Sequence, residues 1–164
     1  MCGRAGLGRH CETLTGARCA GVHRLSTHGG RAVENVTMIG RLHHVVLDCP
    51  DPERLALFYS QVLGWPVTHR GAHWVVVSAG DQASGLAFQL APDHAPPSWP
   101  EPGEPQQMHL DIMVDDPLRA GPRVVALGAV RLAELPGTGG VYADPAGHPF
   151  CLVPRPEWAP PIGP

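Results

Sequence analysis

Two histidines stand at corresponding places in the two halves of this chain. His44 and His109 are 65 residues apart, and each lies early in a short apolar run that predicts a strand. Imidazole can accept or donate a proton near neutral pH, and it can also bind a metal ion. Asp111 follows His109 by two residues, so alternation along a strand places both side chains on one face. These residue types predict acid–base chemistry, with Asp111 orienting a histidine or binding a substrate group.

A glutamine and a cysteine form a second corresponding pair. Gln89 and Cys151 are 62 residues apart, and each lies inside a later apolar segment that predicts a strand. The amide of Gln89 suits hydrogen bonding to a bound organic molecule, whereas Cys151, between two apolar residues, suits a small buried hydrophobe. If a pseudo-twofold axis relates the two halves, these two side chains and the two histidines converge on one cavity.

These polar residues also have simpler structural interpretations. His44 and His109 could hydrogen-bond backbone groups or water in a polar cavity. His43 should point to the opposite face of its strand from His44, and a one-residue shift in register would exchange the two. His148 follows a glycine, which predicts an exposed turn.

The elements that position these residues occur twice in the same order. A helix is expected from the cap Asp51 to a stop at Gly64, with Phe58 and Tyr59 on its buried face, and a second from Asp116 to about residue 127. Pro122 predicts a kink or a late start in the second helix. The expected strands are residues 42–48, 66–70, 73–79 and 86–91, then 108–114, 129–135, 140–143 and 149–154.

The composition excludes two classes of partner. The net charge is −3, divided into +3 over residues 1–37 and −6 over the rest, and an acidic body without a basic stripe argues against nucleic acid. No apolar run approaches the roughly 20 residues of a membrane helix, so we expect no membrane partner. Five cysteines without regular spacing fit reduced thiols, and we therefore expect a cytoplasmic protein.

The pattern divides the chain into a leader, one domain and a tail. Residues 1–37 lack helical or strand periodicity, so we expect a disordered leader, with Met38 as a candidate for the natural start. One domain is expected over residues 38–158, with a first module at 41–92, a proline-rich linker at 93–107 and a second module at 108–155. Residues 159–164 form a proline-rich tail.

Four segments of this domain carry a family resemblance. They are HVVLDCPDP from His44, FYSQVLG at 58–64, MHLD at 108–111 and DPAGHPFCL at 144–152. The chain resembles the vicinal oxygen chelate superfamily, which includes glyoxalase I, extradiol dioxygenases, fosfomycin-resistance enzymes and bleomycin-resistance proteins. The resemblance implies an α+β fold, in which two βαβββ modules form a cupped, eight-stranded mixed sheet around a small ligand. It also implies a homodimer.

The resemblance further implies a set of metal ligands. Metal-using members place ligands at the positions that here hold His44, Gln89, His109 and Cys151, and the last of these is usually glutamate. Cysteine there matches a glyoxalase-like subgroup and removes the hard carboxylate expected of an open catalytic site. A thiolate would favour zinc in a closed site of four ligands. We therefore expect no cofactor, with zinc as the alternative.

Three functions fit this sequence. The first, which the histidines and Asp111 slightly favour, is a lyase or isomerase acting on a small polar organic molecule. Its catalytic residues would be His44, His109 and Asp111, with Gln89 and Cys151 contacting the ligand. The second is a protein that sequesters its ligand without catalysis, as bleomycin-resistance proteins do. The third is a metal-dependent member with an altered ligand set, and the fold alone does not separate the three.

Overall fold

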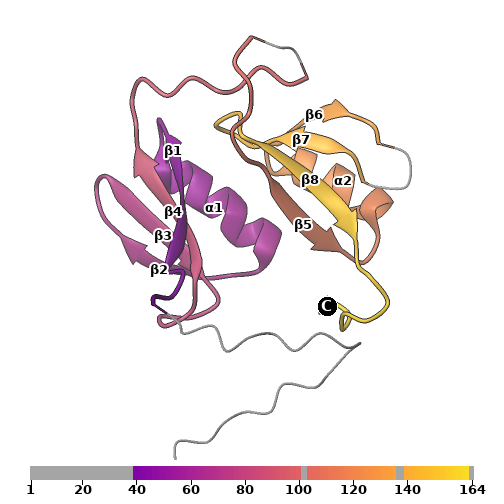
Figure 1. Cartoon of the computed structure of the whole chain (residues 1–164), viewed down its shortest axis with the longest axis horizontal. Coiled ribbons are helices and arrows are strands. Elements are labelled where there is room, and N and C mark those ends of the chain that lie inside the picture. Colours follow the sequence, from indigo (N-terminus) through magenta and orange to yellow (C-terminus); the bar gives the residue numbers. More distant parts are fainter. Residues whose placement is uncertain (1–38, 101–102, 136–138, 163–164) are drawn as a thin grey trace, which may run out of the picture. The chain divides into compact units, whose positions relative to one another are not determined.

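The domain contains two copies of a strand–helix–three-strand module (Figure 1). The computed structural model describes residues 39–100, 103–135 and 139–162, so the expected leader and its start at Met38 lie outside the described residues. The first module contains β1 (His44–Cys49), α1 (Pro52–Leu63), β2 (Val67–Arg70), β3 (Trp74–Ser78) and β4 (Gly85–Leu90). The second contains β5 (Leu110–Val114), α2 (Pro117–Ala126), β6 (Val130–Ala133), β7 (Val141–Ala143) and β8 (Pro149–Pro154). The predicted α+β fold with two βαβββ modules is confirmed.

The eight strands form two four-stranded mixed sheets rather than one continuous sheet. Their orders are β1-β4-β3-β2 and β5-β8-β7-β6. In each sheet the first and last strands of the module pair in parallel, and the other neighbours are antiparallel. Each module also has a register shift at the same place, between Val67 and His69 in β2 and between Arg131 and Ala133 in β6. The shared irregularity supports the internal repeat independently of sequence identity.

Local signals explain where the first helix begins and ends. Asp51 caps α1, because its side chain accepts a hydrogen bond from the backbone N–H of Arg54 at 3.0 Å. Pro52 occupies the first turn, where a missing N–H costs nothing, and Gly64 ends the helix with a left-handed φ of 67°. The predicted buried face is confirmed, since Phe58 and Tyr59 are 2% and 0% exposed.

The second helix differs from its prediction at Pro122. The helix begins at Pro117, directly after the cap Asp116, and continues through Pro122, so there is no late start. Proline at this position removes the N–H that would bond to the carbonyl of Leu118. Both residues lie on the exposed face, and Leu118 is 82% exposed. Water can therefore hydrate that carbonyl, which explains why the helix tolerates the proline.

An aromatic cluster joins the two modules. The ring of Tyr59 in α1 stacks on Phe88 of β4 at 5.5 Å and meets the edge of Phe150 in β8 at 6.5 Å between ring centroids. Phe150 in turn stacks on Tyr142 of β7 at 5.6 Å. All four rings are buried. Aromatic pairs at these distances stabilise a core beyond the effect of buried area, so α1 helps to hold both sheets. Within the described part of the chain, no helix is long and apolar enough to cross a membrane.

Gly85 provides a test of how closely β3 and β4 pack. A Cβ added there would lie 2.3 Å from the carbonyl oxygen of Val77 and 2.6 Å from the Cβ of Ser78, both in β3. We predict that Gly85→Ala lowers the free energy of unfolding by about 1–3 kcal/mol, because overpacking forces two backbones apart. The matched control is Gly80→Ala, where no atom lies within 4 Å of the new Cβ. Thermal melts check this, and equal melting temperatures for the two variants would contradict it.

Candidate functional site

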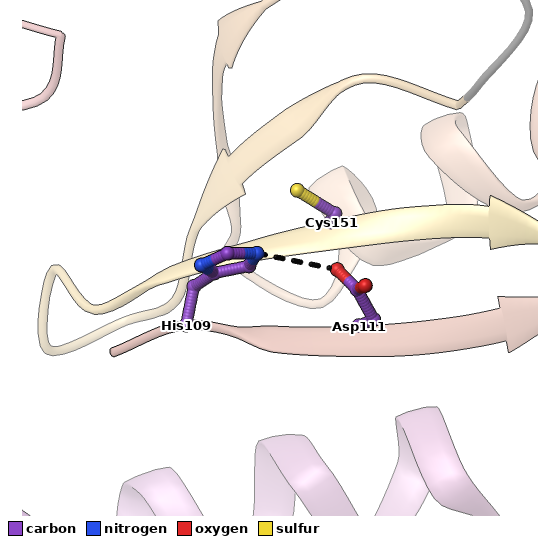
Figure 2. A group of neighbouring side chains, drawn as sticks. All are labelled: His109, Asp111 and Cys151. Atoms are coloured by element: carbon purple, nitrogen blue, oxygen red, sulfur yellow. Dashed lines mark ion pairs between the residues drawn. The ribbon is translucent and has the colours of Figure 1, made fainter.

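Three of the predicted residues meet on the second sheet. The ligand-type atoms of His109, Asp111 and Cys151 all lie within 4.8 Å of one another. His109 precedes β5, Asp111 lies within β5, and Cys151 lies opposite Asp111 in the neighbouring strand β8. Figure 2 shows the three side chains on the same side of these two strands. The Nε2 atom of His109 is 3.4 Å from Oδ1 of Asp111, an ion-pair distance if the imidazole is protonated.

Strand alternation places this cluster on the face away from the core. Leu110 and Ile112 alternate along the chain with His109 and Asp111. Ile112 belongs to the core cluster and is only 7% exposed. The side chains of His109 and Asp111 are 42% and 60% exposed. The cluster is therefore accessible to small molecules, while the same two strands anchor it in the core.

The carboxylate of Asp111 influences the neighbouring thiol. The pKa of Cys151 is raised, chiefly because burial disfavours the charged thiolate, and further by the charge of Asp111 and a hydrogen bond to it. Near neutral pH the cysteine is therefore a protonated thiol that can donate a hydrogen bond to the carboxylate. In that state it is neither a nucleophile nor a metal ligand.

A small pocket adjoins this cluster. Its volume is about 230 Å³, below the roughly 300–1,000 Å³ of pockets for drug-sized ligands. Three imidazoles line it, those of His94, His109 and His148, together with apolar side chains that include Leu47 and Leu110. His109 therefore belongs both to the pocket and to the cluster with Asp111 and Cys151. A pocket of this composition suits a small molecule with an apolar part and a few polar groups.

One wall of the pocket is a hydrogen-bonded network that the sequence did not reveal. The side chain of Asp144 is fully buried, and its Oδ2 accepts a hydrogen bond from the Tyr59 hydroxyl at 2.9 Å. Nδ1 of His148 lies 3.0 Å from the same oxygen. The prediction that His148 belongs to an exposed turn is wrong for its side chain, which is 19% exposed. The sequence signal for this network was the run Asp-Pro-Ala-Gly-His, because an aspartate side chain can hydrogen-bond the backbone of its own turn.

His44 lies outside both the cluster and the set of residues that line the pocket. It begins β1 and is half-buried, with its ring centroid 3.8 Å from that of His43. Its pKa is lowered, first by desolvation and then by the charge of His43, so the neutral imidazole is favoured. A catalytic role for His44 stays a prediction.

The strand register changes the correspondence between Gln89 and Cys151. Cys151 pairs with Asp111, and the equivalent pair in the first sheet is Ala87 with Val46. By register Cys151 therefore corresponds to Ala87, not to Gln89. Gln89 pairs with Asp48. Asp48 lies four residues along β1 from His44, which is roughly 13 Å at the spacing of residues in a strand. The structure thus brings together His109, Asp111 and Cys151 without His44, and Gln89 is not among the residues that line the pocket.

A larger hollow lies elsewhere, beside the start of α1. Its volume is about 490 Å³, but its two carboxylates already have local partners. Asp51 caps the helix, and Glu53 forms an exposed ion pair with Arg70 at 3.0 Å. We therefore place the candidate site at the smaller pocket, where imidazoles gather.

The sequence and fold identify the family. The model of the glyoxalase-like domain family matches residues 44–153, about two thirds of the chain. The chain belongs to this family, within the vicinal oxygen chelate superfamily. The matched range includes both modules and all three residues of the cluster on the second sheet. A comparison with curated proteins found no match.

Solved structures of this superfamily share the fold. A glyoxalase-related enzyme from Fulvimarina pelagi is 25% identical with a TM-score of 0.53, over 76% of this chain and 94% of the other. The fosfomycin resistance protein FosX from Mesorhizobium loti is 21% identical with a TM-score of 0.54, over 73% and 95%. A glyoxalase/bleomycin resistance protein/dioxygenase family enzyme from Burkholderia phytofirmans is 17% identical with a TM-score of 0.52, over 69% and 97%.

The cluster makes a prediction about thiol reactivity. Asp111→Asn removes the charge that helps to raise the pKa of Cys151, so the pKa falls and more thiolate exists at any given pH. Near neutral pH we expect iodoacetamide to alkylate Cys151 faster in this variant, by roughly threefold or more. The rate should rise with pH in both proteins, with the profile of the variant displaced to lower pH. Peptide mapping by mass spectrometry follows Cys151 separately from the other cysteines.

The matched control for this measurement is Asp81→Asn, which removes an exposed acid from the turn between β3 and β4. Its rate of Cys151 alkylation should equal that of the unmodified chain. An unchanged rate in Asp111→Asn, or an equal increase in both variants, would show that Asp111 does not control the thiol.

Proposed function

We propose that this glyoxalase-like protein binds a small polar organic molecule in the 230 Å³ pocket and acts on it as a lyase or isomerase. In this proposal His109 transfers a proton to or from the ligand, and Asp111 orients its ring. The site operates in a cytoplasmic protein whose cysteines stay reduced, consistent with the free thiols of Cys49 and Cys151.

The position of His109 is the observation that carries this proposal. The residue lines the pocket, and its Nε2 atom faces the Asp111 carboxylate at 3.4 Å. A carboxylate beside a histidine fixes its ring orientation and stabilises the imidazolium that forms when it takes up a proton. The partial exposure of both groups lets a ligand reach them from solvent.

Zinc binding is a second candidate, favoured by the same cluster. One imidazole, one carboxylate and one thiol are donor types that zinc accepts, and their atoms are close enough for small rotations to bring them around one ion. Three protein ligands would leave one position open, unlike the closed four-ligand site that the sequence suggested. The donor set therefore fits zinc. His109, Asp111 and Cys151 would hold the ion, which would supply a Lewis acid, and Cys151 would have to release its proton on binding.

Native mass spectrometry of the full chain, purified without chelator or affinity-tag metal and exposed to a metabolite extract, tests the proposal. We predict a retained organic molecule and no stoichiometric metal. His109→Gln should lower its occupancy by about tenfold or more, because it leaves a polar group of the ligand unpaired, and Asp111→Asn should lower it less, because it disturbs only the orientation of the His109 ring. The matched control is His73→Gln, an exposed histidine outside the pocket.

Three outcomes would contradict this proposal in whole or in part. Equal occupancy in all four proteins would place the ligand elsewhere. Elemental analysis that finds near one equivalent of zinc, lost in both His109→Ala and Cys151→Ala, would replace the metal-free site with the zinc site. A retained ligand that no variant or incubation converts to product would favour sequestration over catalysis.

We also propose that the chain forms a homodimer. Each sheet ends in two edge strands, β1 and β2 in the first and β5 and β6 in the second. Edge strands present unpaired backbone groups, which a second copy commonly covers. Light scattering at micromolar concentration should give about twice the chain mass of 17.4 kDa. A monomer mass maintained across a dilution series would rule the dimer out.

A further inference from the structure

The turn between β7 and β8 holds a buried carboxylate beside an imidazole of the pocket. Besides the Tyr59 hydroxyl, the carboxylate of Asp144 accepts hydrogen bonds from the backbone N–H groups of Ala146 at 2.8 Å and His148 at 3.0 Å. The residue as a whole is 3% exposed. These donors satisfy the hydrogen-bonding needs of the buried carboxylate, and they fix its position from two elements of the fold.

This carboxylate determines which nitrogen of His148 carries the proton. Nδ1 of His148 lies 3.0 Å and 3.2 Å from the two oxygens of Asp144. A charged carboxylate only accepts hydrogen bonds, so Nδ1 must be protonated. In the neutral ring the lone pair then resides on Nε2. This is the arrangement by which a buried aspartate prepares a histidine to act as a general base.

A second imidazole keeps the ring of His148 in place. His94, in the linker, packs against it with 4.7 Å between ring centroids, and Nε2 of His94 donates a hydrogen bond to the carbonyl of Ala146 at 3.2 Å. Both rings line the pocket. The linker and the turn therefore hold His148 from two sides, and its side chain stays 19% exposed.

We propose that His148, oriented by Asp144, is a proton-transfer group of this pocket. The inference rests on the proposed function for the location of the ligand, but it assigns the role of the base to His148 rather than to His109. In the step, Nε2 of His148 takes a C–H proton of the ligand, and the electron pair of the broken C–H bond moves onto the adjacent unsaturated group of the ligand. The imidazolium returns the proton to another atom of the same molecule, so the result is an isomerisation without a co-reactant.

The probe 5-nitrobenzisoxazole tests this base without knowledge of the natural ligand. When a base removes the C–H proton of its isoxazole ring, the electron pair forms a nitrile, the N–O bond breaks, and the ring opens to a single coloured cyano-nitrophenolate. We expect the full chain to open the ring faster than free imidazole at equal concentration and pH. His148→Gln should lower that rate by about tenfold or more, because the amide can still donate to Asp144 but has no basic nitrogen.

Controls separate this inference from the proposed function. His73→Gln, outside the pocket, should keep the full rate. A loss in His109→Gln with none in His148→Gln would overturn the role of His148 and leave the proposed function intact. A rate no higher than that of free imidazole would also overturn this inference, whereas ligand retention tests the proposed function independently.

The tautomer of His148 gives a second, activity-free measurement. Long-range ¹H–¹⁵N spectra of the full chain should show the neutral ring protonated on Nδ1. A neutral ring protonated on Nε2 would overturn the proposal, even if the glutamine variant failed to fold.

Discussion

The buried carboxylate of Asp144 is the constraint on which the arrangement of the domain depends. Burying a carboxylate is costly unless hydrogen bonds satisfy it, and Nδ1 of His148 lies 3.0 Å from one oxygen of Asp144. The remaining donors are the hydroxyl of Tyr59 in α1 and backbone N–H groups of its own turn. Satisfying this one carboxylate therefore fixes the helix of the first module against a turn of the second. The ring of Tyr59 reinforces this by packing on Phe150 of β8.

The two histidines His109 and His148 line the pocket, and each pairs with an aspartate in a different physical setting. The pair of Asp111 and His109 is exposed and 3.4 Å apart, and exposed pairs of this kind contribute little to stability. The pair of Asp144 and His148 is shielded and fixed by several hydrogen bonds. The first pair can therefore rearrange around a ligand at small cost, whereas the second offers a ring whose orientation is set before any ligand arrives. A site that combines both can rearrange at the first pair without disturbing the second.

The sequence predicted the order of elements well because their signals are local. Asp51 and Asp116 cap the two helices, apolar periodicity marks the strands, and Pro122 proved compatible with its helix because its face is exposed. Hydrogen-bond register is not local. Sequence spacing paired Gln89 with Cys151, while the parallel ladder pairs Cys151 with Asp111 and leaves Gln89 opposite Asp48. A register shift of two residues leaves each side chain on the same face of its strand, so the alternation of apolar and polar residues could not reveal the shift.

The same register explains why the two modules, so similar in backbone, differ in chemistry. At equivalent positions the first sheet places Val46 opposite Ala87, and the second places Asp111 opposite Cys151. Ala87 is fully buried, and its methyl group cannot bind a proton or a metal ion. The repeat therefore supplies two equivalent frameworks, of which only the second carries reactive groups at this register position. The pocket shares this asymmetry, because His109 and His148 both come from the second module, while the first contributes apolar side chains, Asp48 and Tyr59.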